Sequence, residues 1–147
     1  MKSKLVHESD GQRIFVAVLG TGDEVVESLT QLAREQRLSA AQITAIGAFM
    51  DATVAYFDWD TKTYLPIEVH EQVEVASLTG DIAVDRAGAP ALHMHVVLGR
   101  RDGSAVAGHL AKGHVRPTLE VLIQESPRHL RRTLDAETGL ALIDLSR

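Results

Sequence analysis

Residues 91–110, ALHMHVVLGRRDGSAVAGHL, decide the fold of this chain. The apolar run at 91–98 predicts a buried strand, because it is rich in β-branched and other large apolar side chains. The tripeptide RDG at 101–103 predicts a hairpin turn, which leads into a second strand at 104–110. An antiparallel pair of strands is therefore the unit around which the rest of the chain is expected to be arranged.

Three histidines converge in this hairpin. His93 and His95 are two residues apart, and side chains at that spacing lie on the same face of a strand. In a hairpin centred near residue 102, His95 stands opposite His109, with cross-strand Cβ atoms about 5 Å apart. Three imidazoles with an open coordination position are typical of an exchangeable or catalytic Zn²⁺ site, and nickel, copper or iron would also accept them. The alternative is a polar cluster in which the histidines hydrogen-bond one another or a carboxylate.

Two carboxylates and a fourth histidine are candidate partners of this site. Glu74 lies in the alternating strand predicted at 71–78, where it could orient a ligand histidine or act as a base toward a metal-bound water. Glu120 is a second candidate of the same kind, and His114 follows soon after His109 in a predicted loop. For each of them, a solvated surface side chain is the alternative.

The remaining pattern predicts one helix followed by many strands. The strand at 13–19 ends at a Gly-Thr-Gly-Asp segment, in which Thr21 or Asp23 can cap a helix that runs to about Gln36. Further strands are predicted at 43–49, 52–57, 63–69, 71–78, 82–84, 118–124 and 139–145, with a helical turn after Pro127. This order favours an α+β fold, a mostly antiparallel sheet with one main helix packed on one face, over residues 1–147 as a single domain.

Composition limits the class of function. The 147 residues suit one domain, and the absence of cysteine excludes a disulfide framework and a thiolate metal site. We expect a cytoplasmic protein without membrane contact, because no apolar stretch approaches about 20 residues and no secretory signal is visible. The net charge of −5 is opposite to the basic excess of a free-standing DNA-binding domain, so the cluster Arg128, Arg131 and Arg132 is interpreted as a solvated surface.

Short motifs follow one another along almost the whole chain: IGA at 46–48, EVASLTGDI at 74–82, HMH at 93–95, GHL at 108–110 and TLEV at 118–121. In this order they resemble the plants and prokaryotes conserved (PPC) domain family, although Asp81 stands where asparagine is common. The resemblance implies a homotrimer in which His93, His95 and His109 hold a metal ion, expected to be zinc. It also implies a link to DNA, but plant members contact DNA through a separate Arg-Gly-Arg-Pro segment that this sequence lacks.

Three functions are compatible with these observations. The first is a trimeric metal-binding protein that acts on a small molecule, and the histidines with their nearby carboxylates favour it. The second is a DNA-associated regulatory oligomer. The third is a non-enzymatic assembly module in which the histidines are structural.

Overall fold

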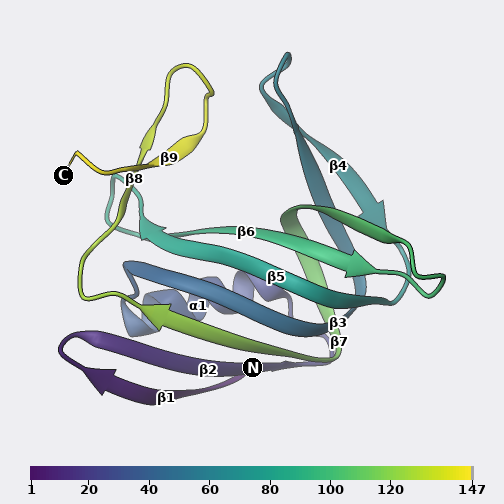
Figure 1. Cartoon of the computed structure of the whole chain (residues 1–147), viewed down its shortest axis with the longest axis horizontal. Coiled ribbons are helices and arrows are strands. Elements are labelled where there is room, and N and C mark those ends of the chain that lie inside the picture. The colour runs from purple at the N-terminus through teal and green to yellow at the C-terminus, as the bar shows by residue number, and fades with distance from the viewer. Residues whose placement is uncertain (147) are drawn as a thin grey trace.

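The computed structural model describes residues 1–146, which form nine strands and one helix (Figure 1). The elements in chain order are β1 (Lys2–Ser9), β2 (Gln12–Gly20), α1 (Val25–Gln36), β3 (Ala40–Asp58), β4 (Thr63–Val69), β5 (Val73–Val84), β6 (Pro90–Gly99), β7 (Ala105–Glu125), β8 (Arg131–Leu134) and β9 (Ala141–Asp144). The main path of the sheet is β1-β2-β7-β3-β5-β8-β9, with β4 beside β3 and β6 between β5 and β7. The described strand pairs are antiparallel except β5 with β8, so the sheet is mixed.

The predicted α+β class is wrong. The structure is mostly β, with 65% of the chain in strands and 8% in one short helix, instead of a sheet with a main helix on its face. The sequence was divided into too many short strands: 43–49 and 52–57 belong to β3, 71–78 and 82–84 to β5, and 104–110 and 118–124 to β7. In addition, β1 lies where no strand was predicted, and β8 follows Pro127 in place of a helical turn.

Glycines inside two of the long strands allow close approach of a neighbouring strand. Gly80 falls in the gap between the predicted strands 71–78 and 82–84, but it lies inside β5, where an added Cβ would be 2.3 Å from the backbone oxygen of His93 on β6. Gly47 lies inside β3 at φ +154°, and its Cβ would be 2.2 Å from the backbone oxygen of Thr118 on β7. Both glycines allow two strands to approach closely, and neither ends a strand. Gly47 lies beside a register shift in the pairing of β3 with β5 and with β7.

Neither of the predicted capping residues, Thr21 and Asp23, is the N-cap of α1, which begins at Val25. Its N-cap is Glu24, whose carboxylate accepts hydrogen bonds from the backbone N–H of Glu27 and of Gly113 at 2.7 and 3.0 Å. Asp23 instead accepts from the backbone N–H of Gly20. The apolar stripe of α1, including fully buried Leu29 and Leu32, joins one core with buried side chains of the strands. Complete burial of one such leucine contributes about 2 kcal/mol.

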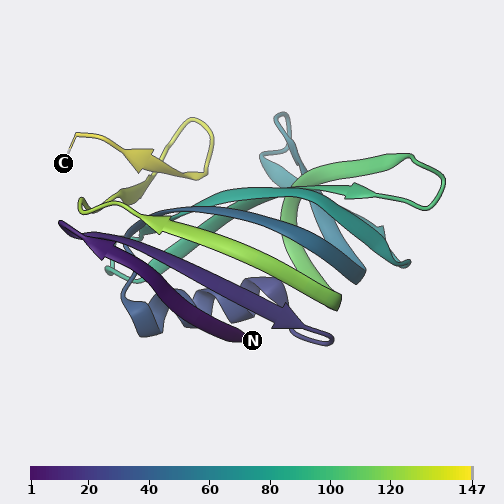
Figure 2. The same cartoon turned by 60° about the horizontal axis from the view of Figure 1, so that its bottom comes forward.

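Strands β3, β5, β6 and β7 form a closed ring of pairings. Both β3 and β6 pair with β5 and with β7. Figures 1 and 2 show the β3–β4 and β8–β9 hairpins standing away from the strands at separate ends, with β6 running between them and α1 lying on the other side. One face of β6 is therefore flanked by two hairpins. Within residues 1–146 no helix has the length and apolar character that a membrane crossing requires.

Candidate metal centre

The hairpin of β6 and β7 has the register that the sequence predicts. His95 pairs directly with His109, and Val97 pairs with Ala107 nearer the turn. Met94 and Val96 are buried on the core face of β6, with 2% exposure each, which directs their neighbours His93 and His95 to the opposite face. Core packing of the apolar residues thus fixes the orientation of the two histidines.

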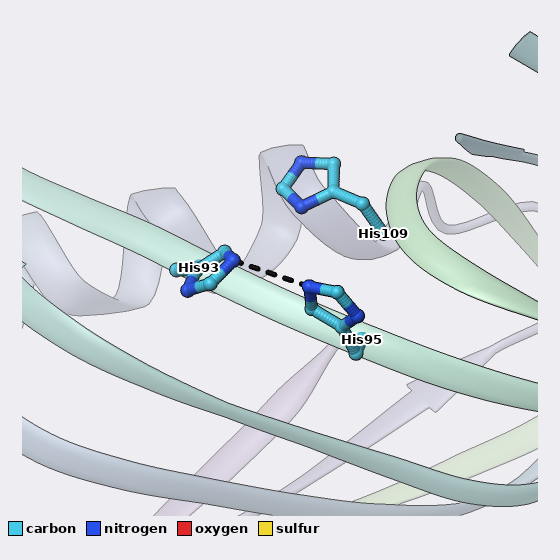
Figure 3. Close-up of side chains that lie close together, drawn as sticks. All are labelled: His93, His95 and His109. Carbon is cyan, nitrogen blue, oxygen red and sulfur yellow. Dashed lines mark hydrogen bonds between the residues drawn. The ribbon is translucent and has the colours of Figure 1, made fainter. Parts of the chain in front are cut away.

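The three imidazoles form one cluster (Figure 3). The Nε2 atoms of His93 and His95 are 3.3 Å apart, and the ring centroids of His93 and His109 are 5.4 Å apart. One ring nitrogen from each histidine lies within 4.8 Å of the other two. The cluster therefore offers three nitrogen donors from two adjacent strands.

This donor set fits a zinc ion. Zn–N bonds of about 2.0–2.1 Å in tetrahedral geometry separate the ligand nitrogens by about 3.3 Å. The His93–His95 pair already has this separation, and the longest separation in the cluster exceeds it by about 1.5 Å, which small side-chain rotations can remove. Three protein donors leave a fourth position open to a small molecule.

The environment favours the neutral form of two of the imidazoles. Burial lowers the pKa of His93 below its ordinary value of 6.5, and the positive charge of Arg132 lowers it further. Burial, followed by the neighbouring His93 and His95, also lowers the pKa of His109. The Nδ1 atom of His109 is buried and has no hydrogen-bond partner in the described structure. Neutral rings with an unsatisfied nitrogen are in the state that metal ligation requires.

Asp81 is the carboxylate nearest to the cluster. It pairs with His93 across β5 and β6, and its Oδ2 lies 3.8 Å from Nδ1 of His93. Its other oxygen, Oδ1, accepts a hydrogen bond of 2.5 Å from Nη2 of Arg132, which is itself 8% exposed. Asp81 is therefore held beside His93 by a buried arginine, in a position to orient that imidazole.

A cavity of about 200 Å³ adjoins the cluster. The ring of Tyr64, from β4, lies 4.7 Å from the ring of His109, measured between centroids. The β8–β9 hairpin supplies Arg132 and Leu142 to the cavity wall, and Leu92 lines it from β6. The cavity is thus mostly apolar, and imidazoles of the candidate metal site form part of its wall.

The other predicted partners do not join the cluster. Glu74 pairs with Gly99, four residues along β6 from His95, which corresponds to about 13 Å of strand. Glu120 lies far along β7, opposite Ile46. Nδ1 of His114 donates a hydrogen bond of 2.6 Å to Oδ1 of Asp51, away from the three histidines. Asp81, and not Glu74, is therefore the carboxylate that the structure places beside His93.

The predicted arginine cluster is divided by the strand geometry. Arg132 is buried and paired with Asp81, so it is not part of a solvated surface. Arg128 and Arg131 are exposed. Adjacent residues of a strand face opposite sides, which explains why Arg131 and Arg132 have different environments.

Sequence and site together define the class. The structure has a histidine cluster with the donor set of a metal site, on a long-stranded sheet beside a small cavity. The family model of the plants and prokaryotes conserved (PCC) domain matches residues 6–127, and the chain belongs to this family.

Solved structures are similar over nearly the whole chain. A metal-containing protein of Archaeoglobus fulgidus is 31% identical, with a TM-score of 0.82, over 97% of this chain and 96% of that one. A plant- and prokaryote-conserved protein of Pyrococcus horikoshii is 27% identical, with a TM-score of 0.84, over 92% and 93%. A proposed DNA-binding protein of Bacteroides thetaiotaomicron is 28% identical, with a TM-score of 0.86, over 96% of both chains. No functionally curated protein was found to match.

Proposed function

We propose that the protein is a trimeric, zinc-binding member of this family that acts on a small molecule at an open coordination position. The observation that carries the proposal is the convergence of His93, His95 and His109, with donor nitrogens within 4.8 Å, beside a cavity of about 200 Å³. The similarity to a metal-containing protein of Archaeoglobus fulgidus supports it.

The residues around the site have distinct roles in this proposal. His93, His95 and His109 hold the ion, and Asp81 orients His93. A zinc ion with three imidazole ligands supplies Lewis-acid activation of an oxygen-bearing substrate. Leu92, Leu142 and the Tyr64 ring exclude water from the substrate and select a compact, largely apolar molecule.

The metal is tested directly. Purified protein is loaded with zinc, dialysed and analysed for metals by elemental mass spectrometry. We expect about one zinc ion per chain. Protein that folds normally and retains no metal after loading would make the histidines a polar cluster and would remove the basis of the proposal.

Zinc affinity is expected to depend on pH in a defined direction. A histidine must be neutral to bind metal. The pKa values of His93 and His109 are lowered from the ordinary histidine value of 6.5, which favours the neutral rings at lower pH than in an ordinary histidine. Zinc affinity should therefore change little between about pH 8 and 6.5 and should weaken only at lower pH. Calorimetric titration in a series of buffers measures this dependence, and a steep loss already above pH 7 would contradict it.

An exposed apolar surface on the sheet supports self-association. Ile46, Val18 and Leu122 are 62%, 42% and 40% exposed, and Val18 on β2 and Ile46 on β3 stand on either side of exposed Glu120 on β7. Ile46, Leu122 and Glu120 line a shallow cavity of about 340 Å³. Exposed apolar side chains gathered around a shallow cavity, with few charged groups among them, favour a protein–protein contact here.

Replacement of Ile46 by aspartate is expected to break the trimer. A second carboxylate beside Glu120 repels it and loses its own hydration on association, which together cost several kcal/mol per contact. Light scattering coupled to size exclusion should give about three chain masses for the wild type and one for Ile46→Asp. Ile67→Asp, an exposed isoleucine on β4, is the matched control and should remain trimeric. An unchanged mass for Ile46→Asp would place the interface elsewhere.

A further inference from the structure

A second cavity, of about 400 Å³, lies where the C-terminal end of α1 meets β5, β6 and β8. Four of its lining side chains are basic or titrate as bases: Arg34, Arg37, His129 and Arg131. No carboxylate lines it among the residues that the structure describes. The volume falls within the range of about 300–1,000 Å³ for sites of small organic ligands.

The three arginines of this cavity are unpaired. Within residues 1–146, Arg34, Arg37 and Arg131 have no ion pair and no side-chain hydrogen bond. Arg13, Arg100 and Arg132, by contrast, each pair with a carboxylate. The chain has 20 acidic residues against 15 basic ones, yet none of the described acidic residues lines this cavity. The three arginines are exposed, so solvent screens part of their mutual repulsion, and a bound anion would lower it further.

Arg37 also has an unusual backbone conformation. It follows α1 at φ 53° and ψ 44°, the left-handed position where helices usually have glycine. An arginine there carries a steric cost that glycine avoids. This conformation places Arg37 directly after α1, where its side chain lines the cavity together with Arg34.

The negative groups near the cavity are already engaged. Helix C-termini disfavour anions, but the carbonyl groups of Ala33 and Arg34 accept hydrogen bonds from the backbone N–H groups of residues 37 and 38. Glu125 is bound by Arg13 and by the backbone N–H of Ser39. Asp85 accepts from two backbone N–H groups of its own turn. Asp144 stands opposite Arg131 in the β8–β9 register, whereas within residues 1–146 no ion pair joins a carboxylate to Arg34 or Arg37.

We propose that this cavity binds a small organic phosphate. Arg34, Arg37 and Arg131 bind the phosphate group, for which guanidinium groups are well suited. His129 is oriented by a hydrogen bond of 2.6 Å between its Nδ1 and Oγ of Ser39. Leu38, Val84 and Pro90 supply an apolar wall for the organic part of the ligand. This site is separate from the histidine cluster and does not depend on the proposed metal.

Calorimetry with phenyl phosphate as the probe tests the proposal in phosphate-free buffer of physiological salt. Zinc-loaded full-length protein and His95→Ala should bind it equally, which separates this cavity from the metal site. Arg131→Gln should weaken binding about tenfold, as expected for the loss of one charge-assisted contact. Arg37→Gly should weaken binding similarly without lowering the melting temperature, because glycine suits the left-handed position. Arg101→Gln, with the same change in charge at a distant turn, is the matched control and should leave binding unchanged.

Further probes identify the source of the phosphate. Inorganic phosphate should bind more weakly than phenyl phosphate, and phenol should not bind. Equal affinity for inorganic phosphate and phenyl phosphate would overturn the organic part of the proposal. If Arg131→Gln and Arg101→Gln lost the same affinity for phenyl phosphate, the net charge of the protein would explain the loss, and the assignment of the site to this cavity would be overturned. Binding of a DNA duplex that is lost in Arg131→Gln, without binding of phenyl phosphate, would also overturn it in favour of a nucleic-acid surface.

Discussion

Replacement of His95 by alanine is expected to remove stoichiometric zinc and to weaken zinc affinity by at least about 100-fold. His95 supplies one of three nitrogen donors, and its Nε2 atom lies 3.3 Å from that of His93. Changes to residues that only orient a metal ligand cost about 10–100-fold in affinity, so loss of a ligand should cost more. His95 is exposed and contributes little to the core, so the variant should fold normally. Elemental analysis and competition with a chromogenic chelator measure both quantities.

The matched control for this variant is His114→Ala. His114 lies on β7, five residues from His109, but its ring is hydrogen-bonded to Asp51 and is not part of the cluster. This control should retain zinc at the wild-type level. Full zinc occupancy in His95→Ala, or equal loss in His114→Ala, would contradict the assignment of the site.

The cluster itself was predictable because a hairpin is a local structure. The turn at 101–103 and alternation along β6 are enough to place His95 opposite His109, and the structure has this pairing. The neighbours of the cluster were not predictable in this way. Asp81 reaches it from β5, and Tyr64 and Arg132 reach it from two other hairpins. Their placement depends on the order of strands in the sheet, which a single sequence does not define.

The choice of Glu74 instead of Asp81 has a specific cause. Asp81 follows Gly80 and falls between the predicted strands 71–78 and 82–84, whereas Glu74 lies in the alternating segment. In the structure both belong to β5, and a register shift lies between the pairings of Val75 and Ser77 with β6. One glycine that allows close approach of two strands was thus interpreted as the end of a strand, which hid the nearest carboxylate.

The same glycine gives the second large effect: Gly80→Ala is expected to lower the free energy of unfolding by about 3 kcal/mol and to weaken zinc binding. An alanine Cβ at position 80 would lie 2.3 Å from the backbone oxygen of His93 and 2.7 Å from Cγ of Met94. Side-chain rotation relieves only the second of these contacts, so β6 has to move away from β5. That movement displaces His93, while His109 is held on β7. Chemical denaturation and zinc titration measure the two effects.

Gly99→Ala separates this effect from the general cost of replacing a strand glycine. Gly99, the last residue of β6, also pairs with β5, but the nearest neighbours of an added Cβ there are atoms of Glu74 at 3.9 Å, an ordinary contact distance. Gly99→Ala should therefore keep the wild-type stability within about 1 kcal/mol and the wild-type zinc affinity. If Gly80→Ala matched Gly99→Ala in both measurements, the close approach of β5 to β6 at His93 would not be what positions the metal ligands. A loss of zinc affinity in Gly80→Ala alone, measured on protein that remains folded, would link the packing of these two strands directly to the geometry of the histidine cluster.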